Sequence, residues 1–159
     1  PSIFLANGVT STFPGGEIDP EKMLEARRAI NRGEKIGPRI HSSGPYFGTA
    51  FPGWDPETTE AEIFARVDKW AELGVAGFKA KGIKPYQLKA LIERAHKHGL
   101  TVTGHLGSGA RNTVNPRDAI NMGIDRIEHF LGGDALPKSQ SAYATLQNLN
   151  PKDMYCGRQ

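Results

Sequence analysis

Hydrophobic and polar positions along this chain follow two alternating periods. Apolar residues spaced three or four positions apart, as in Ile63, Val67 and Trp70, predict helices with one buried face. Short apolar runs between glycines and prolines predict strands. The predicted strands are 8–13, 37–43, 75–81, 100–105 and 124–130, and the predicted helices are 20–31, a helix from Thr58 or Thr59 to Gly74, 85–97, 116–122 and 139–149.

The ends of the first predicted helix are marked by their residue types. Asp19 is a typical N-cap, Pro20 occupies the first helical position, and Gly33 follows the last turn. A loop rich in glycine and proline is predicted over 44–53. Strands that alternate with helices in this way indicate right-handed βα units, and hence an α/β fold with a parallel sheet.

About five βα units are predicted, and their periodicity alone fits either a doubly wound sheet or a barrel. Polar residues at the carboxyl ends of several strands favour the barrel, because active sites of (β/α)8 barrels lie there. We therefore expect one domain over 1–159, a partial (β/α)8 barrel, with a C-terminal tail of uncertain assignment over 139–159.

Composition narrows the class of protein. The 159 residues include 38% hydrophobic and 23% charged residues, and no apolar run approaches the roughly 18 residues of a membrane span. The net charge of +3 is spread among acidic residues, so neither nucleic acid nor a membrane is an expected partner. One cysteine, Cys156, favours a reducing, cytoplasmic location, with secretion left open because the chain begins at Pro1.

Two predicted strands on either side of a helix each deliver one histidine. His105 ends the run 100–105, and His129 lies near the end of 124–130. In a parallel sheet both imidazoles arrive at the same edge, which is how a metal site is built on a barrel. One such histidine is more often structural, whereas two on consecutive strands favour metal ligands.

Several segments in series resemble the metal-dependent amidohydrolase superfamily, in the branch of imidazolonepropionases and prolidase-like dipeptidases. The resemblance covers most of residues 4–136, and the ordered series is more specific than any single motif. The segments are Phe4–Thr12, Ala26–Ile30 leading to Gly37–Ile40, Gly74–Lys79, Ala95–His105 and Ala119–His129.

The resemblance implies the middle of a distorted (β/α)8 barrel, strands 2 to 6, that holds one or two divalent metals, with zinc expected. Matched residue by residue, it implies that Lys79 is the strand 4 lysine, often carboxylated, and that His105 and His129 are the strand 5 and strand 6 ligands. Lys79 and Lys81 share strand parity, so either could instead form an ordinary ion pair at the sheet edge. His41 ends a strand and is a candidate for binding substrate.

The implied reaction is metal-assisted hydrolysis of an amide or other C–N bond in a small molecule, such as a cyclic amide or a dipeptide. The family's His-x-His pair is absent, since His96 and His98 lie at a helix end, where they complement the helix dipole. The strand 8 aspartate that transfers protons in the family is also absent, so the catalytic residue is unknown. We therefore expect this chain alone to be inactive.

Two alternatives stay open. A class I aldolase-type lyase also carries a lysine at the edge of an α/β barrel, where Lys79 or Lys81 would form a Schiff base without metal. The other alternative is a catalytically inactive barrel fragment. Either way, five strands of a closed barrel leave two strand edges exposed, so we expect a homo-oligomer.

Overall fold

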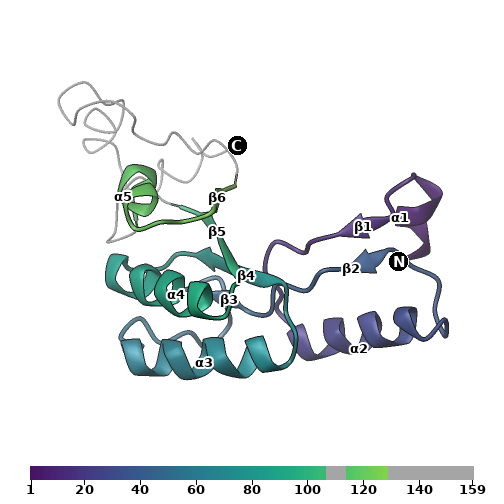
Figure 1. Ribbon diagram of the computed structural model, residues 1–159, viewed down its shortest axis with the longest axis horizontal. Helices are drawn as coiled ribbons and strands as arrows, with labels where there is room; N and C mark the ends of the chain where they lie inside the picture. The colour runs from purple at the N-terminus through teal and green to yellow at the C-terminus, as the bar shows by residue number, and fades with distance from the viewer. Residues whose placement is uncertain (107–113, 129–159) are drawn as a thin grey trace.

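The computed structural model describes residues 1–106 and 114–128 (Figure 1). Its elements alternate between helices and short strands. They are α1 (Ser2–Ala6), β1 (Ser11–Thr12), α2 (Pro20–Asn31), β2 (Arg39–Ile40), β3 (Tyr46–Phe47), α3 (Glu60–Glu72), β4 (Gly77–Lys81), α4 (Pro85–Lys97), β5 (Thr101–His105), α5 (Pro116–Asn121) and β6 (Arg126–Ile127).

All strand pairs of the described residues are parallel. Strands β3, β4, β5 and β6 form one sheet in chain order, and β1 pairs with β2 in a second, two-stranded sheet. An isolated parallel bridge between Glu17 and Pro45 continues the pairing from the second sheet toward the first. Within each sheet, every strand lies beside its neighbour in sequence, and the predicted α/β class with a parallel sheet is confirmed.

The long helices lie where the sequence predicts them. Helices α2 and α4 have the predicted bounds, and the Asp19 side chain caps α2 by accepting a hydrogen bond from the Lys22 amide (3.1 Å). Thr59 caps α3 in a capping box, in which Glu62 reaches back to the Thr59 amide (2.8 Å). None of the helices described in the two ranges is long and apolar enough to cross a membrane.

The first strands differ from the prediction. The predicted strand 37–43 is shortened to β2, and β3 is a strand that lies within the predicted loop 44–53. Between them Gly44 has a φ of 62°, and the Ser42 and Ser43 groups bind the Glu17 carboxylate, which takes this segment out of regular pairing. Strand β1 is shorter than predicted, and helix α1, with no buried residue, was not predicted. The predicted helix 139–149 lies outside the described residues.

The hydrophobic core lies between one face of the four-stranded sheet and the helices. Phe78 and Ala80 of β4 and Val102 of β5 are fully buried there. Helices α3 and α4 supply the opposite side of the core with Ile63, Val67, Leu88, Leu91 and Ile92. In Figure 1, α2 and α3 lie below the strands, and β1 and β2 extend to the right of the larger sheet. The other face of the sheet is thereby left without a covering helix among the described residues.

Candidate functional site

The face of the sheet that points away from the core carries polar side chains on every strand from β4 to β6. Successive residues of a strand point to opposite faces, so the residues that alternate with Phe78, Ala80 and Val102 form one surface. The register pairs Lys79 with Thr103 and Thr103 with Arg126. We call this surface the inner face; it consists of Gly77, Lys79, Lys81, Thr101, Thr103, His105, Arg126 and Glu128.

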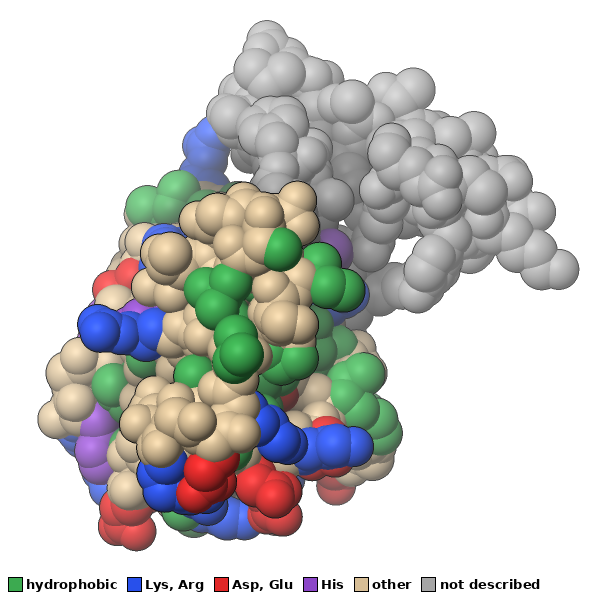
Figure 2. Space-filling view, turned by 90° about the vertical axis from the view of Figure 1, so that its right-hand side faces the viewer, with side chains coloured by type: hydrophobic (Ala, Val, Ile, Leu, Met, Phe, Trp, Pro, Cys, Tyr) green, Lys and Arg blue, Asp and Glu red, His purple; other side chains and the backbone are tan. Residues whose placement is uncertain are grey.

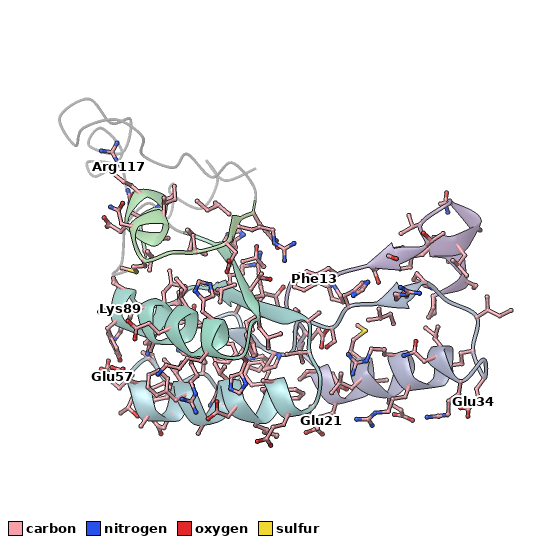
Figure 3. All side chains as sticks on the ribbon, in the orientation of Figure 1. Phe13, Glu21, Glu34, Glu57, Lys89 and Arg117 are labelled. Atoms are coloured by element: carbon pink, nitrogen blue, oxygen red, sulfur yellow. The ribbon has the colours of Figure 1, made fainter. Side chains whose placement is uncertain are left out.

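Phe13, which follows β1, covers the amino end of the inner face. The Arg126 guanidinium lies over the Phe13 ring, with its carbon 5.0 Å from the ring centroid. It also donates a hydrogen bond to Thr101 Oγ1 (3.3 Å). A Cβ on Gly77 would stand 2.8 Å from the Thr101 carbonyl oxygen, so glycine permits the close approach of β4 and β5 here. Figure 3 shows Phe13 between the strand β1 and the larger sheet.

The centre of the inner face holds an ion pair between Lys79 and Glu128. Lys79 is only 2% exposed, and its Nζ contacts Glu128 Oε2 across strand β5. Thr103 Oγ1, which lies between them in the register, donates a hydrogen bond to Glu128 Oε1 (3.0 Å). On the far side a Cβ on Gly15 would stand 3.3 Å from Glu128 Oε2. The carboxylate is thus held between three strands and the segment after β1.

Burial lowers the pKa of the Lys79 ammonium, because an apolar environment disfavours the charged form. The Glu128 carboxylate acts in the opposite direction, and the positive charge of Lys81 adds to the lowering. A buried amine with a depressed pKa is closer to the nucleophilic neutral form than a surface lysine is.

The carboxyl end of the inner face carries Lys81 and His105, which are partners in the register of β4 and β5. The backbone at this end is fixed, because the Thr49 amide donates to the Gly82 carbonyl (3.1 Å). Gly48, at φ 120°, lies so close to the Lys81 carbonyl that any side chain at position 48 would collide with it. The end of β4 is therefore held rigidly by the loop after β3.

The structure brings together two of the four residues that the sequence singles out. Lys79 and His105 lie on the same face of adjacent strands. His129 lies outside the described residues, directly after Glu128. His41 is exposed and precedes Tyr46, the register partner of Lys79, by five positions, so it lies toward the amino end of the sheet. Its assignment to substrate binding stays a prediction.

Glu128 is the site residue that sequence reasoning missed. Its side chain crosses β5 to reach Lys79, a contact that the sequence analysis does not predict. The signal was present in the alternation, because Arg126 and Glu128 occupy every second position, as Lys79 and Lys81 do on β4. The alternation does not predict that the Glu128 carboxylate extends across β5 as far as Lys79.

The two histidines at the end of α4 lie outside the inner face. His96 Nε2 contacts Asp125 Oδ2 (2.9 Å), and His98 Nε2 contacts Asp68 Oδ1 (2.6 Å). Arg94 binds the same Asp68 with two hydrogen bonds of 2.6 Å, which together with His98 lowers the pKa of Asp68 to about 2. These contacts join helices and strands on the outer side of the sheet, as expected for structural residues.

Within 1–106 and 114–128, no group of three or more His, Cys, Asp or Glu side chains is placed to hold a metal ion. On the described inner face, the Lys79 amine is paired with Glu128, and His105 ends the adjacent strand.

Comparison with solved structures gives several neighbours whose names are those of hydrolases. A Bifidobacterium longum protein that carries the name prolidase is 24% identical, with a TM-score of 0.62 over 78% of this chain and 33% of its own. A Xaa-Pro dipeptidase with methionine bound in its active site is 23% identical, with a TM-score of 0.65 over 80% of this chain and 38% of its own. An amidohydrolase is 17% identical, with a TM-score of 0.62 over 80% and 39%. No family model matches the sequence.

These likenesses show the fold, part of the α/β barrel of amidohydrolase-type proteins. The neighbours carry the names of the superfamily that the sequence motifs resemble, which is consistent with a fragment of that superfamily. This chain spans between 33% and 39% of the length of these three structures.

Proposed function

We propose that this chain is the central part of a metal-dependent hydrolase that cleaves an amide or other C–N bond in a small molecule, such as a cyclic amide or a dipeptide. One observation carries the proposal. Lys79 is buried on the inner face at the centre of β4, and His105 ends the adjacent strand on the same face. Carboxyl ends of parallel strands are where barrels of this kind place their chemistry.

The donor types on the inner face fit a zinc ion in part. His105 and His129 supply imidazole nitrogens, which zinc takes readily, and a carboxylated Lys79 would supply anionic oxygens. In the described structure Lys79 is a cation paired with Glu128, so it is not a ligand in this state. A bound metal would activate water and polarise the scissile carbonyl.

The chain's own residues would then exclude water and orient the site. Lys79 is held by a fully formed strand, and the Thr103 hydroxyl donates a hydrogen bond to Glu128 beside it. Once Lys79 is carboxylated, two anions would face each other, so Glu128 would have to turn away or accept a proton. Glu128 therefore competes with any modification of Lys79.

Metal binding tests the proposal directly. Zinc content is measured by elemental analysis after dialysis for the wild type, His105→Ala, His129→Ala and His98→Ala. Loss of a first ligand typically lowers affinity by orders of magnitude, so the first two variants should lose bound zinc. His98→Ala is the matched control, since His98 contacts Asp68 on the outer side of the sheet. Equal zinc content in all four proteins contradicts the proposal.

Hydrolysis is then measured with metal-loaded protein expressed from the complete open reading frame. Xaa-Pro dipeptides and N-acyl amino acids are offered as substrates, and release of the free amino acid is followed. The histidine variants that lose zinc should lose turnover in parallel. Turnover that survives the loss of zinc would argue against a metal-dependent reaction.

The contact between Lys79 and Glu128 also favours the second candidate function, a Schiff-base lyase. A buried amine next to a carboxylate is the arrangement in which a lysine condenses with a carbonyl carbon, with loss of water, while the acid transfers protons. Borohydride reduces such an imine to a stable amine. Covalent labelling of Lys79 by a carbonyl compound and borohydride, without metal, would support the lyase and count against the hydrolase.

A further inference from the structure

The inner face of the described residues carries more positive than negative charge. Lys79, Lys81 and Arg126 are cations, and Glu128 is the one carboxylate that the same surface contributes. The nearby Asp125 accepts hydrogen bonds from the Val102 amide (2.8 Å) and contacts His96 (2.9 Å) on the other side of the strand. The Asp125 carboxylate therefore interacts with groups outside the inner face.

The three cations of the inner face differ in their interaction partners. Lys79 is paired with Glu128, and Arg126 stacks on Phe13 and donates to Thr101. Lys81, half-buried at the carboxyl end of β4, forms no ion pair with a carboxylate of the described residues. Placing a partly desolvated cation beside a second lysine is costly unless an anion accompanies it.

The position of Lys81 is set by the backbone. Its carbonyl and that of Gly82 accept hydrogen bonds from Ala50 and Thr49 (3.4 and 3.1 Å), and its register partner is His105 on the next strand, about 4.8 Å away in a sheet. Lys81 therefore lies at the fixed carboxyl end of β4, on the same face as Lys79 and beside His105 in the register.

We infer that Lys81 is the residue that binds a carboxylate group of the substrate, and that this site accepts molecules with a free carboxylate in preference to their neutral amides. That the ligand is a substrate rests on the proposed function. A ligand with one negative charge matches the single positive charge of Lys81. A phosphate dianion would call for further donors, such as a guanidinium fork, and no arginine stands beside Lys81 at this end of the described inner face.

Binding of two matched ligands to the full chain tests this inference without any turnover. Ala-Pro and Ala-Pro amide differ only in the carboxylate, and their affinities are compared by calorimetry at low salt, after treatment with a chelator so that no metal contributes. The wild type should bind the acid about tenfold more tightly than the amide, and added salt should reduce the difference.

Three variants separate the role of Lys81 from a general effect of charge. Lys81→Met should abolish the preference for the acid, whereas Lys81→Arg should keep most of it. Lys89→Met is the control, because Lys89 is an exposed lysine on helix α4, paired with Glu93 and remote from the inner face (Figure 3). Circular dichroism checks that each variant is folded.

Four results would overturn the inference. They are equal affinity of the wild type for acid and amide, no binding of the acid, a preference for the acid that persists in Lys81→Met, and displacement of Ala-Pro by inorganic phosphate at equal affinity. A preserved preference for the acid in a protein that shows no hydrolysis would reject the hydrolase alone. Hydrolysis without the preference would reject only the role of Lys81.

Discussion

Lys79 and Glu128 meet across an intervening strand, with the Thr103 hydroxyl donating to the carboxylate from the strand between them. Their positions on β4 and immediately after β6 are separated by 49 residues of sequence, since 128 − 79 = 49. The pair therefore links β4 to the residue that follows β6.

Replacing Glu128 by Gln should destabilise the fold, because it leaves a buried ammonium without its counter-ion. We expect a loss of about 1–3 kcal/mol in the free energy of unfolding measured by urea denaturation. Glu34→Gln is the control, because the Arg32–Glu34 pair is exposed and screened by solvent, so its loss should change stability much less. Equal effects in the two variants would show that the inner pair is not formed in solution.

Glu17 should make the fold less stable as pH rises. Its carboxyl group is buried, which raises its pKa above the ordinary 4.5, although hydrogen bonds from Ser42 and Ser43 oppose the shift. The contribution of a group whose pKa is raised on folding is fully present below pH 4.5 and is lost as pH rises through the folded value. Glu17→Gln should therefore gain stability relative to the wild type between about pH 4 and pH 7. A constant difference over this range in urea denaturation would contradict the prediction.

Asp68 should stabilise the fold, and this contribution should be lost at low pH. Its pKa is about 2 in the folded protein against 3.8 ordinarily, because Arg94 and His98 bind the carboxylate. Its stabilising contribution is present above pH 3.8 and is lost as pH falls toward 2. Asp68→Asn should be less stable than the wild type by about 0.5–1 kcal/mol at pH 6, since the pair is partly exposed, and the difference should vanish in acid. Thermal unfolding at several pH values measures this, and a difference that persists at pH 2 would rule it out.

The end of the molecule at α1 should take part in self-association. Ile3 and Ile36 are 76% and 77% exposed, and Phe4 and Val9 are exposed beside them; we call these four residues the apolar end patch. Figure 2 shows hydrophobic side chains on this end of the molecule. Soluble monomers rarely leave such a cluster uncovered. Light scattering should therefore give a mass above 17.3 kDa.

Two variants locate that association. Phe4→Ser combined with Ile36→Asp should shift the protein toward the monomer. Ile120→Asp, on helix α5 at the other end of the molecule, should leave the mass unchanged. A clean monomer in the wild type would show that the apolar end patch does not mediate association.

Much of the fold could be predicted from local signals. Helix α2 has its cap at Asp19 and a proline at its start, and α4 begins at Pro85, so their bounds follow from the residues themselves. Strands β4 and β5 are buried apolar runs on one face, and their predicted positions differ from the structure by one or two residues. The parallel pairing follows because a helix connects each strand to the next.

What could not be predicted depends on contacts between distant residues. Strands β2 and β3 are separated because Glu17 binds the backbone and side chains near Ser42, a contact with no local signature. The partner of Lys79 could not be predicted either, since that requires the register of β4, β5 and β6 together. The predicted ligand His129 lies outside the described residues, so the metal site stays a proposal.

The stacking of Arg126 on Phe13 joins residues 113 positions apart, since 126 − 13 = 113. Closing so long a loop costs chain entropy, so we expect this contact to form after the intervening βα units have assembled. A ligand that binds only to the completed inner face should therefore bind only once Phe13 and Arg126 have come into contact.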